Sequence, residues 1–399
     1  MSDLPLPRPP RLPPLPAAHP RCRLSVTVPA KDEAGYITQT LQALARQQDG
    51  NGQPLDPTLY EVIVLANNCR DATAEVARAF GRQHPRLRLH VAEITLPPAV
   101  AGVGLSRKLM MDAAARRLPS HGIIATTDAD TRVGARWVAH SLRAFDRGAR
   151  AVGGRILVPR GERRGYRKIH LQDVTYRSLR ALLETMIDPS PTDPWPRHFQ
   201  HYGPSLAVRA DAYLACGGMP PVKSIEDAAF AWALERTDVE IVHDPSVRVY
   251  TSDRGSDRIG GVTFSGALDA WTEMDHDGRV PVVFGLEHCI ELYKWKVALQ
   301  QAFHRRRVSG LPALPGLCDR LNISLEDLSR EVREAPTAGD LYVRIRQQLE
   351  RLPVSSDAPF PEAIRDLRRF TGAARDHRAS GIPPDGSVPG GLAAPGRTP

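Results

Sequence analysis

The hydrophobic and polar positions in the first third of the chain follow two alternating periods. Residues 24–29 alternate apolar and polar side chains, several of them β-branched, which predicts a strand. Residues 60–66 form an almost wholly apolar run, typical of a strand buried on both faces. Between them, Ile37, Leu41 and Leu44 recur at helical spacing. The same reasoning predicts strands at 87–93 and 122–127 and helices at 72–80 and 105–117. Strands that alternate with helices in this way predict an α/β fold, a mostly parallel sheet with helices on both faces.

The second half of the chain is less regular. Residues 151–158 predict a strand and 168–186 a long helix, after which four prolines within 188–196 exclude a helix. Further strands are expected at 203–208, 239–242 and 247–250, and helices at 210–214 and 226–235. Beyond residue 262 the pattern is helical, with predicted segments around Trp271 and at 287–304, 325–334 and 341–352.

Many of the 36 prolines lie at the two ends of the chain, where no periodic pattern is present. Such composition favours disorder, because it offers too little apolar surface to bury. We therefore predict a disordered proline-rich tail at 1–22, an α/β domain at 23–260, a helical C-terminal extension at 261–371 and a disordered Gly/Pro-rich tail at 372–399.

The composition, 42% hydrophobic and 25% charged residues, is that of a soluble globular protein. The five cysteines form no C-x-x-C pair, which favours free thiols in a reducing compartment over disulfides or a zinc site. No apolar run is long enough to span a bilayer and no signal peptide is evident, so we expect a cytoplasmic protein. The net charge of +8 suits several anionic partners, and it would allow peripheral contact with a membrane surface.

Acidic and polar residues follow three of the predicted strands. They occupy 30–33, 67–71 and 128–130, and the carboxyl ends of parallel strands are where such sheets bind ligands. In the third turn, Asp128 and Asp130 are one residue apart, a spacing that can hold a hard divalent cation against two phosphates. Acidic pairs also end many strands as turn formers or helix caps, so the motif alone is a weak signal.

Taken in chain order, seven short motifs resemble those of the family 2 glycosyltransferases. They lie at 28–33, 67–73, 105–108, 128–130, 203–209, 217–218 and 226–227. The resemblance covers roughly residues 24–254 and implies the GT-A fold, with a nucleotide-sugar half at 23–131 and an acceptor half at 132–260. The second turn departs from the family pattern, since most members carry two successive aspartates where this chain has Ala66 and Asn67.

The resemblance also implies roles for individual residues. Asp227 would be the base that takes the proton of the acceptor hydroxyl in an inverting single displacement, with Glu226 supporting it. Asp128 and Asp130 would bind Mg²⁺ or Mn²⁺, with Asp130 the direct ligand. The residues expected to bind the nucleotide-sugar are Pro29, Ala30, Glu33, Asn67, Arg107, Lys108, Asp128, Arg254 and Arg258. The acidic residues that begin helices also have a local explanation, because carboxylates complement the helix dipole there.

The implied activity is transfer of a hexose from a nucleotide-diphosphate sugar to an acceptor hydroxyl, on a small molecule or a lipid-linked one. Two alternatives remain open. A sugar nucleotidyltransferase has a related sheet, but that class opens with a glycine-rich loop and an arginine, whereas residues 29–33 here read Pro-Ala-Lys-Asp-Glu. A non-catalytic, basic nucleic-acid-binding protein would explain the pI near 9.4 but leaves the ordered acidic turns unexplained.

Overall fold

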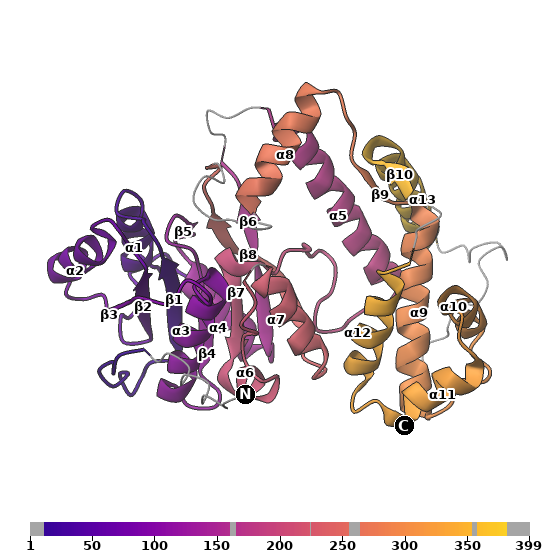
Figure 1. Cartoon of the computed structure of the whole chain (residues 1–399), viewed down its shortest axis with the longest axis horizontal. Coiled ribbons are helices and arrows are strands. Elements are labelled where there is room, and N and C mark those ends of the chain that lie inside the picture. The colour runs from indigo at the N-terminus through magenta and orange to yellow at the C-terminus, as the bar shows by residue number, and fades with distance from the viewer. Residues whose placement is uncertain (1–11, 160–164, 224, 255–263, 353–356, 381–399) are drawn as a thin grey trace, which may run out of the picture.

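The computed structural model describes residues 12–159, 165–223, 225–254, 264–352 and 357–380. An eight-stranded mixed sheet forms one side of the molecule, and a group of helices forms the other (Figure 1). The strand order is β3-β2-β1-β4-β7-β6-β8-β5. The strands are β1 Leu24–Ala30, β2 Tyr60–Asn67, β3 Leu89–Ile94, β4 Ile123–Thr126, β5 Arg132–Val133, β6 Ala151–Leu157, β7 Leu206–Arg209 and β8 Ile241–Tyr250.

The first four strands of the sheet, β3, β2, β1 and β4, are mutually parallel, as the alternation of strands and helices predicts. Strand β7 runs antiparallel to both of its neighbours, β4 and β6, so the sheet is mixed beyond β4. The helices around the sheet are α1 Ile37–Ala45, α2 Thr73–Gln83, α3 Val103–Arg117, α4 Trp137–Asp146, α6 Ala210–Ala215 and α7 Glu226–Glu235, with a short 3₁₀ turn, η1, at Gly203–Ser205.

Both faces of the sheet are buried, which explains the continuous apolar run of β2. Val62 and Val64 join a core formed with α1, α2 and α4, while Ile63 and Leu65 join a second core formed with α3, α6 and α7. Successive side chains of a strand point to opposite faces, so a strand covered on both sides needs apolar residues at consecutive positions.

The helical part is built from one helix of the α/β region and six helices that follow it. Helix α5, Arg167–Ile187, lies between β6 and β7 in the chain, yet it packs against α8, α9 and α13 (Figure 1). The later elements are α8 Phe264–His276, β9 Val282–Phe284, α9 Leu286–Arg305, α10 Ala313–Leu321, α11 Leu325–Glu334, α12 Ala338–Leu349, β10 Asp357–Pro359 and α13 Phe360–Ser380. The helical extension therefore includes a segment that we had expected to lie within the acceptor half.

Several boundaries differ from the sequence-based expectation. Residues 239–250 contain one strand, β8, rather than two, because a register shift opposite Gly154 and Arg155 lets the strand continue through the polar stretch between the two apolar runs. The expected N-terminal tail is in contact with the core over 12–22, where Leu12, Leu15 and Ala18 pack against the second core. At the other end, α13 continues nine residues past the predicted boundary at 371, to Ser380. None of the described helices is long and apolar enough to cross a membrane.

Candidate active site

The turns that follow β1, β2, β4 and β8 lie at one edge of the sheet. Strand β1 pairs in parallel with both β2 and β4, which brings the turns after Ala30, Asn67 and Thr126 together. The turn after β8 joins them, because the Thr131 hydroxyl donates to the Thr251 hydroxyl at 3.1 Å. The topology thus places the acidic turns at the edge where parallel sheets bind ligands.

Arg107, on α3, is the centre of a buried polar network. Its side chain is only 3% exposed and forms ion pairs with Asp128 and with Glu226, the latter at 3.0 Å from Nε. It also donates to the Thr126 hydroxyl and, at 3.3 Å, to the Gly203 carbonyl. Burial lowers the pKa of Arg107, but the charges of Asp128 and Glu226 outweigh burial and raise it. Arg107 therefore joins the turn after β4 to the start of α7.

Glycine at position 203 leaves room for this network. A Cβ atom placed there would lie 2.4 Å from Nη2 of Arg107. The Gly203 N–H donates to the Asp227 carboxylate at 3.1 Å, while its carbonyl accepts from Arg107. One glycine thus contacts both the buried arginine and the predicted base.

The two acidic residues that begin α7 have different environments. Glu226 is 7% exposed and is bound to Arg107, whereas Asp227 is half-buried and accepts hydrogen bonds from the backbone N–H groups of Gly203 and Ala228, at 3.1 and 2.8 Å. The preceding residue, Ile225, has a φ of 52°, a left-handed conformation that is strained for a β-branched side chain. This strained turn presents both carboxylates toward the Arg107 network.

The Asp128 and Asp130 carboxylates are both accessible in part, at 29% and 19% of their side-chain surface. Burial, reinforced by the charge of Asp130, raises the pKa of Asp128 to about 6 despite the opposing effect of Arg107. One oxygen of Asp130 accepts from the Ser252 hydroxyl at 2.6 Å and pairs with Arg254. The donor set is made of hard carboxylate oxygens, and two such ligands suit a cation that shares its coordination with substrate phosphates.

Arg254 follows β8 and lies over the Tyr36 ring, with the guanidinium carbon 3.8 Å from the ring centroid. It pairs with Asp130 and, at 3.1 Å, with Glu33. Its Nη1 atom is buried without a hydrogen-bond partner in the described part of the chain. Arg254 is therefore held at the sheet edge with one donor still available. Arg258, predicted to act with it, lies outside the described residues.

The other residues expected to bind the donor occupy the first two turns and α3. Pro29 and Ala30 end β1, and Asn67 is buried at the end of β2. Lys108 does not join the Arg107 network, since its Nζ pairs with Asp112 one helical turn further along α3, at 3.2 Å.

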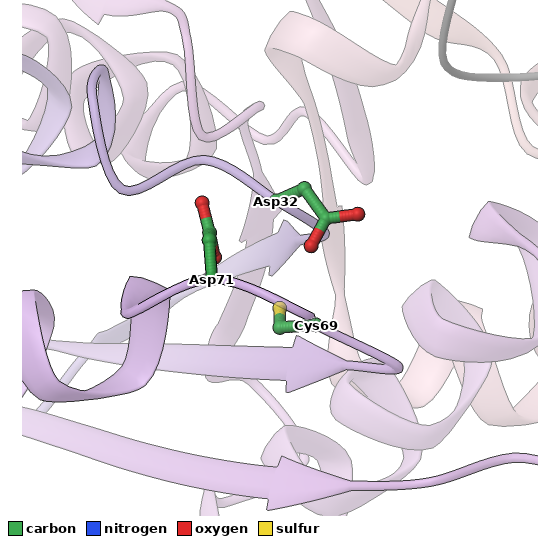
Figure 2. Close-up of side chains that lie close together, drawn as sticks. All are labelled: Asp32, Cys69 and Asp71. Atoms are coloured by element: carbon green, nitrogen blue, oxygen red, sulfur yellow. The ribbon is translucent and has the colours of Figure 1, made fainter.

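A second acidic cluster lies between the first two turns. The side chains of Asp32, Cys69 and Asp71 approach one another there (Figure 2). Their polar atoms already bind the two turns together: Asp32 accepts from the Arg70 N–H at 2.7 Å, and Asp71 accepts from the Ala34 N–H at 2.9 Å. These bonds explain the cluster as a link between the turns, and we assign no ion to it.

Sequence reasoning missed the residues that approach the site from the helical part. Arg177 on α5 donates to the Tyr202 hydroxyl at 3.5 Å, and Tyr202 immediately precedes Gly203. Three histidines, at 198, 201 and 243, form one cluster, and the His201 ring lies next to that of Tyr202. The only sequence signal for Tyr202 was its position directly before the motif at 203–209.

These features define an α/β protein with an acidic, arginine-linked site at the carboxyl edge of its sheet. Residues 25–203 match the model of "Glycosyl transferase family 2", so this region belongs to that family and the chain is an enzyme of glycosyltransferase type. The resemblance and the fold class inferred from the sequence are thereby confirmed. No curated protein matches the sequence.

Three solved structures illustrate what the fold is similar to. A mannosyltransferase, PcManGT, from Pyrobaculum calidifontis in complex with GDP-Man and Mn²⁺ is 17% identical, with 85% of this chain and 90% of that chain covered and a TM-score of 0.43. S. aureus TarS 1-349 in complex with UDP-GlcNAc is 14% identical, with coverage of 82% and 91% and a TM-score of 0.42. The M. tuberculosis glucosyl-3-phosphoglycerate synthase is 16% identical, with coverage of 66% and 85% and a TM-score of 0.36. Likenesses this distant carry no weight for the substrates of this chain.

Proposed function

We propose that this enzyme transfers a sugar from a nucleotide-diphosphate donor to an acceptor hydroxyl, with Asp227 as the general base. The observation that carries the proposal is the division of roles between two adjacent carboxylates. Glu226 is bound to the buried Arg107, whereas Asp227 accepts only backbone N–H groups among the described residues. A carboxylate with no cation bound to it keeps an oxygen available for a proton, as a general base requires.

The donor side of the site supports the same proposal. Arg107 fixes the Asp128 carboxylate, and Arg254, stacked on Tyr36, has an unpartnered Nη1 that can donate to a phosphate oxygen. Asp130 and Asp128 would hold a divalent cation, Mg²⁺ or Mn²⁺. When bound, such a cation neutralises charge on a diphosphate leaving group. In the transfer itself, Asp227 would take the hydroxyl proton at a carboxylate oxygen as the acceptor oxygen attacks the anomeric carbon of the sugar and the bond from that carbon to the nucleotide diphosphate breaks.

Donor binding is tested by thermal unfolding with UDP-, GDP- and dTDP-sugars, with and without Mn²⁺. A donor at 100 times its Kd should stabilise the protein by about 2.7 kcal/mol. Asp130→Asn retains an acceptor for Ser252 but loses the charge, so we expect its metal-dependent stabilisation to disappear. Asp277→Asn, which changes an exposed carboxylate in the helical part, is the matched control.

Chemistry is tested separately, with Asp227→Asn. We expect transfer, or hydrolysis of the donor by water, to fall about 10²- to 10⁴-fold while donor binding is unchanged. An Asp227→Asn enzyme that retains full turnover would refute the role of Asp227, and the absence of any nucleotide-sugar binding by the wild-type protein would refute the proposed function as a whole.

A further inference from the structure

Helix α5 carries Glu184, which balances two cations on neighbouring segments. Arg197, on the loop, pairs with Glu184 at 2.7 Å and with Asp193 at 3.0 Å. Lys296, on α9, pairs with Glu184 at 2.9 Å and with Asp188 at 3.0 Å. Both cations are largely buried, and each forms ion pairs with two carboxylates.

Arg180, on the same helix, is different. In the described part of the chain, no carboxylate lies within ion-pair distance of it, and its Nε is buried without a hydrogen-bond partner. Its guanidinium lies near the rings of three aromatic residues, at 5.6 to 6.0 Å from their centroids: Tyr176, Phe284 and Tyr293. Cation–π contacts compensate only part of the cost of burying a charge. Arg180 is therefore a partly buried positive charge that no carboxylate of the described residues pairs with.

Arg177 lies one helical turn away, three residues before Arg180, so the two share a face of α5. Its side chain is 45% exposed and its Nε is bound to Asp173 at 2.8 Å, while Nη1 reaches the Tyr202 hydroxyl at 3.5 Å. Burial and the charges of Asp173 and Asp227 raise the pKa of Tyr202, against the opposing effect of Arg177. The phenol thus remains protonated at neutral pH and available as a donor. Tyr202 immediately precedes Gly203, whose N–H donates to Asp227, so the phenol is carried by the stretch of chain that joins Arg177 to the proposed base.

We propose that Arg177, Arg180 and Tyr202 form a subsite for a phosphate group carried by the acceptor. This inference rests on the proposed function and names the acceptor class: an alcohol that also carries a phosphate. Two guanidinium groups and a phenol offer more donors than a carboxylate can accept, whereas a phosphate has three oxygens to receive them. Tyr202 connects the subsite to the chemistry, because the next residue, Gly203, donates its N–H to Asp227.

The first experiment is a calorimetric titration of the full chain with inorganic phosphate and, separately, with glycerol 3-phosphate. We expect binding that weakens at least tenfold in Arg177→Gln and in Arg180→Met, where methionine fills the aromatic pocket without a charge. Arg330→Gln, which changes an exposed arginine on α11, should bind as the wild type does. Arg254→Gln identifies any phosphate that binds at the donor site instead. Binding at the donor site would be lost in Arg254→Gln and retained in Arg180→Met.

The second experiment distinguishes a soluble phosphate from a lipid headgroup, by co-sedimentation with phosphatidylcholine vesicles with and without phosphatidic acid. Binding to phosphatidic acid that requires Arg180 assigns the subsite to a lipid phosphate, and Arg180-dependent binding of the soluble phosphates alone assigns it to a soluble acceptor. The inference would be overturned if neither the soluble phosphates nor the phosphatidic acid vesicles bind, or if binding is equal in the wild type and both α5 variants.

Donor stabilisation in the same variants separates the two proposals. If Arg180→Met binds nucleotide-sugar normally and phosphate binding does not depend on Arg180, only the subsite is wrong. If phosphate binding depends on Arg180 but no nucleotide-sugar binds, the proposed function is wrong and the anion site remains. A thermal unfolding curve of each variant without ligand shows whether the fold is retained, and Arg177→Gln tests the subsite even if Arg180→Met does not fold, because Arg177 is half-exposed.

Discussion

His198 and His201 should make this protein sensitive to mild acid. The backbone N–H of Gln200 donates to Nδ1 of His198 at 3.0 Å, which leaves no room for a proton on that nitrogen, and Nε2 is buried without a partner in the described residues. His201 lies 3.1 Å from the ring of His243, whose Nδ1 is bound to Asp193 at 2.7 Å. Burial, together with His243, lowers the pKa of both His198 and His201 to about 3.

The size of the effect follows from proton linkage. Each histidine has a pKa near 6.5 in the unfolded chain and about 3 in the folded one, so the unfolded state takes up protons first as the pH falls. Stability is therefore present above pH 6.5 and lost as the pH falls toward 3. Between pH 7 and pH 5 the loss is about 2 kcal/mol for each histidine, or about 4 kcal/mol for the pair. Since domains are typically stable by about 5–15 kcal/mol, this loss is large.

The assay is urea unfolding at pH 7 and pH 5, followed by fluorescence. Replacing both histidines, in His198→Asn with His201→Asn, should lower stability at pH 7 and remove most of the difference between the two pH values. His276→Gln is the control, because that side chain is 88% exposed and its loss should leave the pH dependence unchanged. Equal wild-type stability at the two pH values, or an unaltered pH dependence in the double variant, would refute this reasoning.

Three further predictions follow from individual contacts. Gly203→Ala should reduce turnover at least tenfold, because its Cβ would meet Nη2 of Arg107 at 2.4 Å and displace the arginine that fixes Asp128; initial rates at saturating donor test this, and unchanged turnover would contradict it. Arg117→Met should lower the free energy of unfolding by about 3–5 kcal/mol in chemical denaturation, since it removes the 2.6 Å ion pair of the buried Glu61. A loss below about 1 kcal/mol would show that His90 and Ser25 alone stabilise the Glu61 carboxylate. Ser324→Ala should cost about 1 kcal/mol of unfolding free energy, because it removes the capping box of α11 with Asp327, whereas Ser324→Asp should restore most of it.

The sequence predicts well those strands and helices that are long enough for the burial of their side chains to produce a regular spacing of apolar residues. Strand β2 was predicted from its apolar run because both faces of the sheet are covered, and α9 was predicted at nearly its full length. The strands that were missed, β5, β9 and β10, are two or three residues long. So short a segment carries too few positions to show a period, and its pairing is determined by distant parts of the chain.

The site residues show the same limit. The motif order predicted which turns would meet, because parallel strands align their carboxyl ends. It did not predict that Arg107 would be bound between Asp128 and Glu226, since a basic residue in the first turns of a helix gives no indication of partners 21 and 119 residues away. Glu61 is a similar case, an acidic residue in an apolar strand whose partner, Arg117, lies at the end of α3.

The position of α5 explains how the helical part is connected to the proposed base. The chain leaves the sheet after β6, forms α5 among the later helices, and returns to Gly203 through the loop that carries His198 and His201. The connection is the short stretch from Arg197 to Gly203. Its Arg197 and Tyr202 side chains bind α5, and its His201 side chain binds His243 of β8. Because Arg177 and Arg180 come from α5 and Asp227 from α7, the phosphate of an acceptor bound at α5 would be held by one part of the molecule and its hydroxyl activated by the other. A rate that depends on Arg180 only for phosphorylated acceptors would be the kinetic sign of this arrangement, since the binding energy of a remote group is then used to position the reacting one.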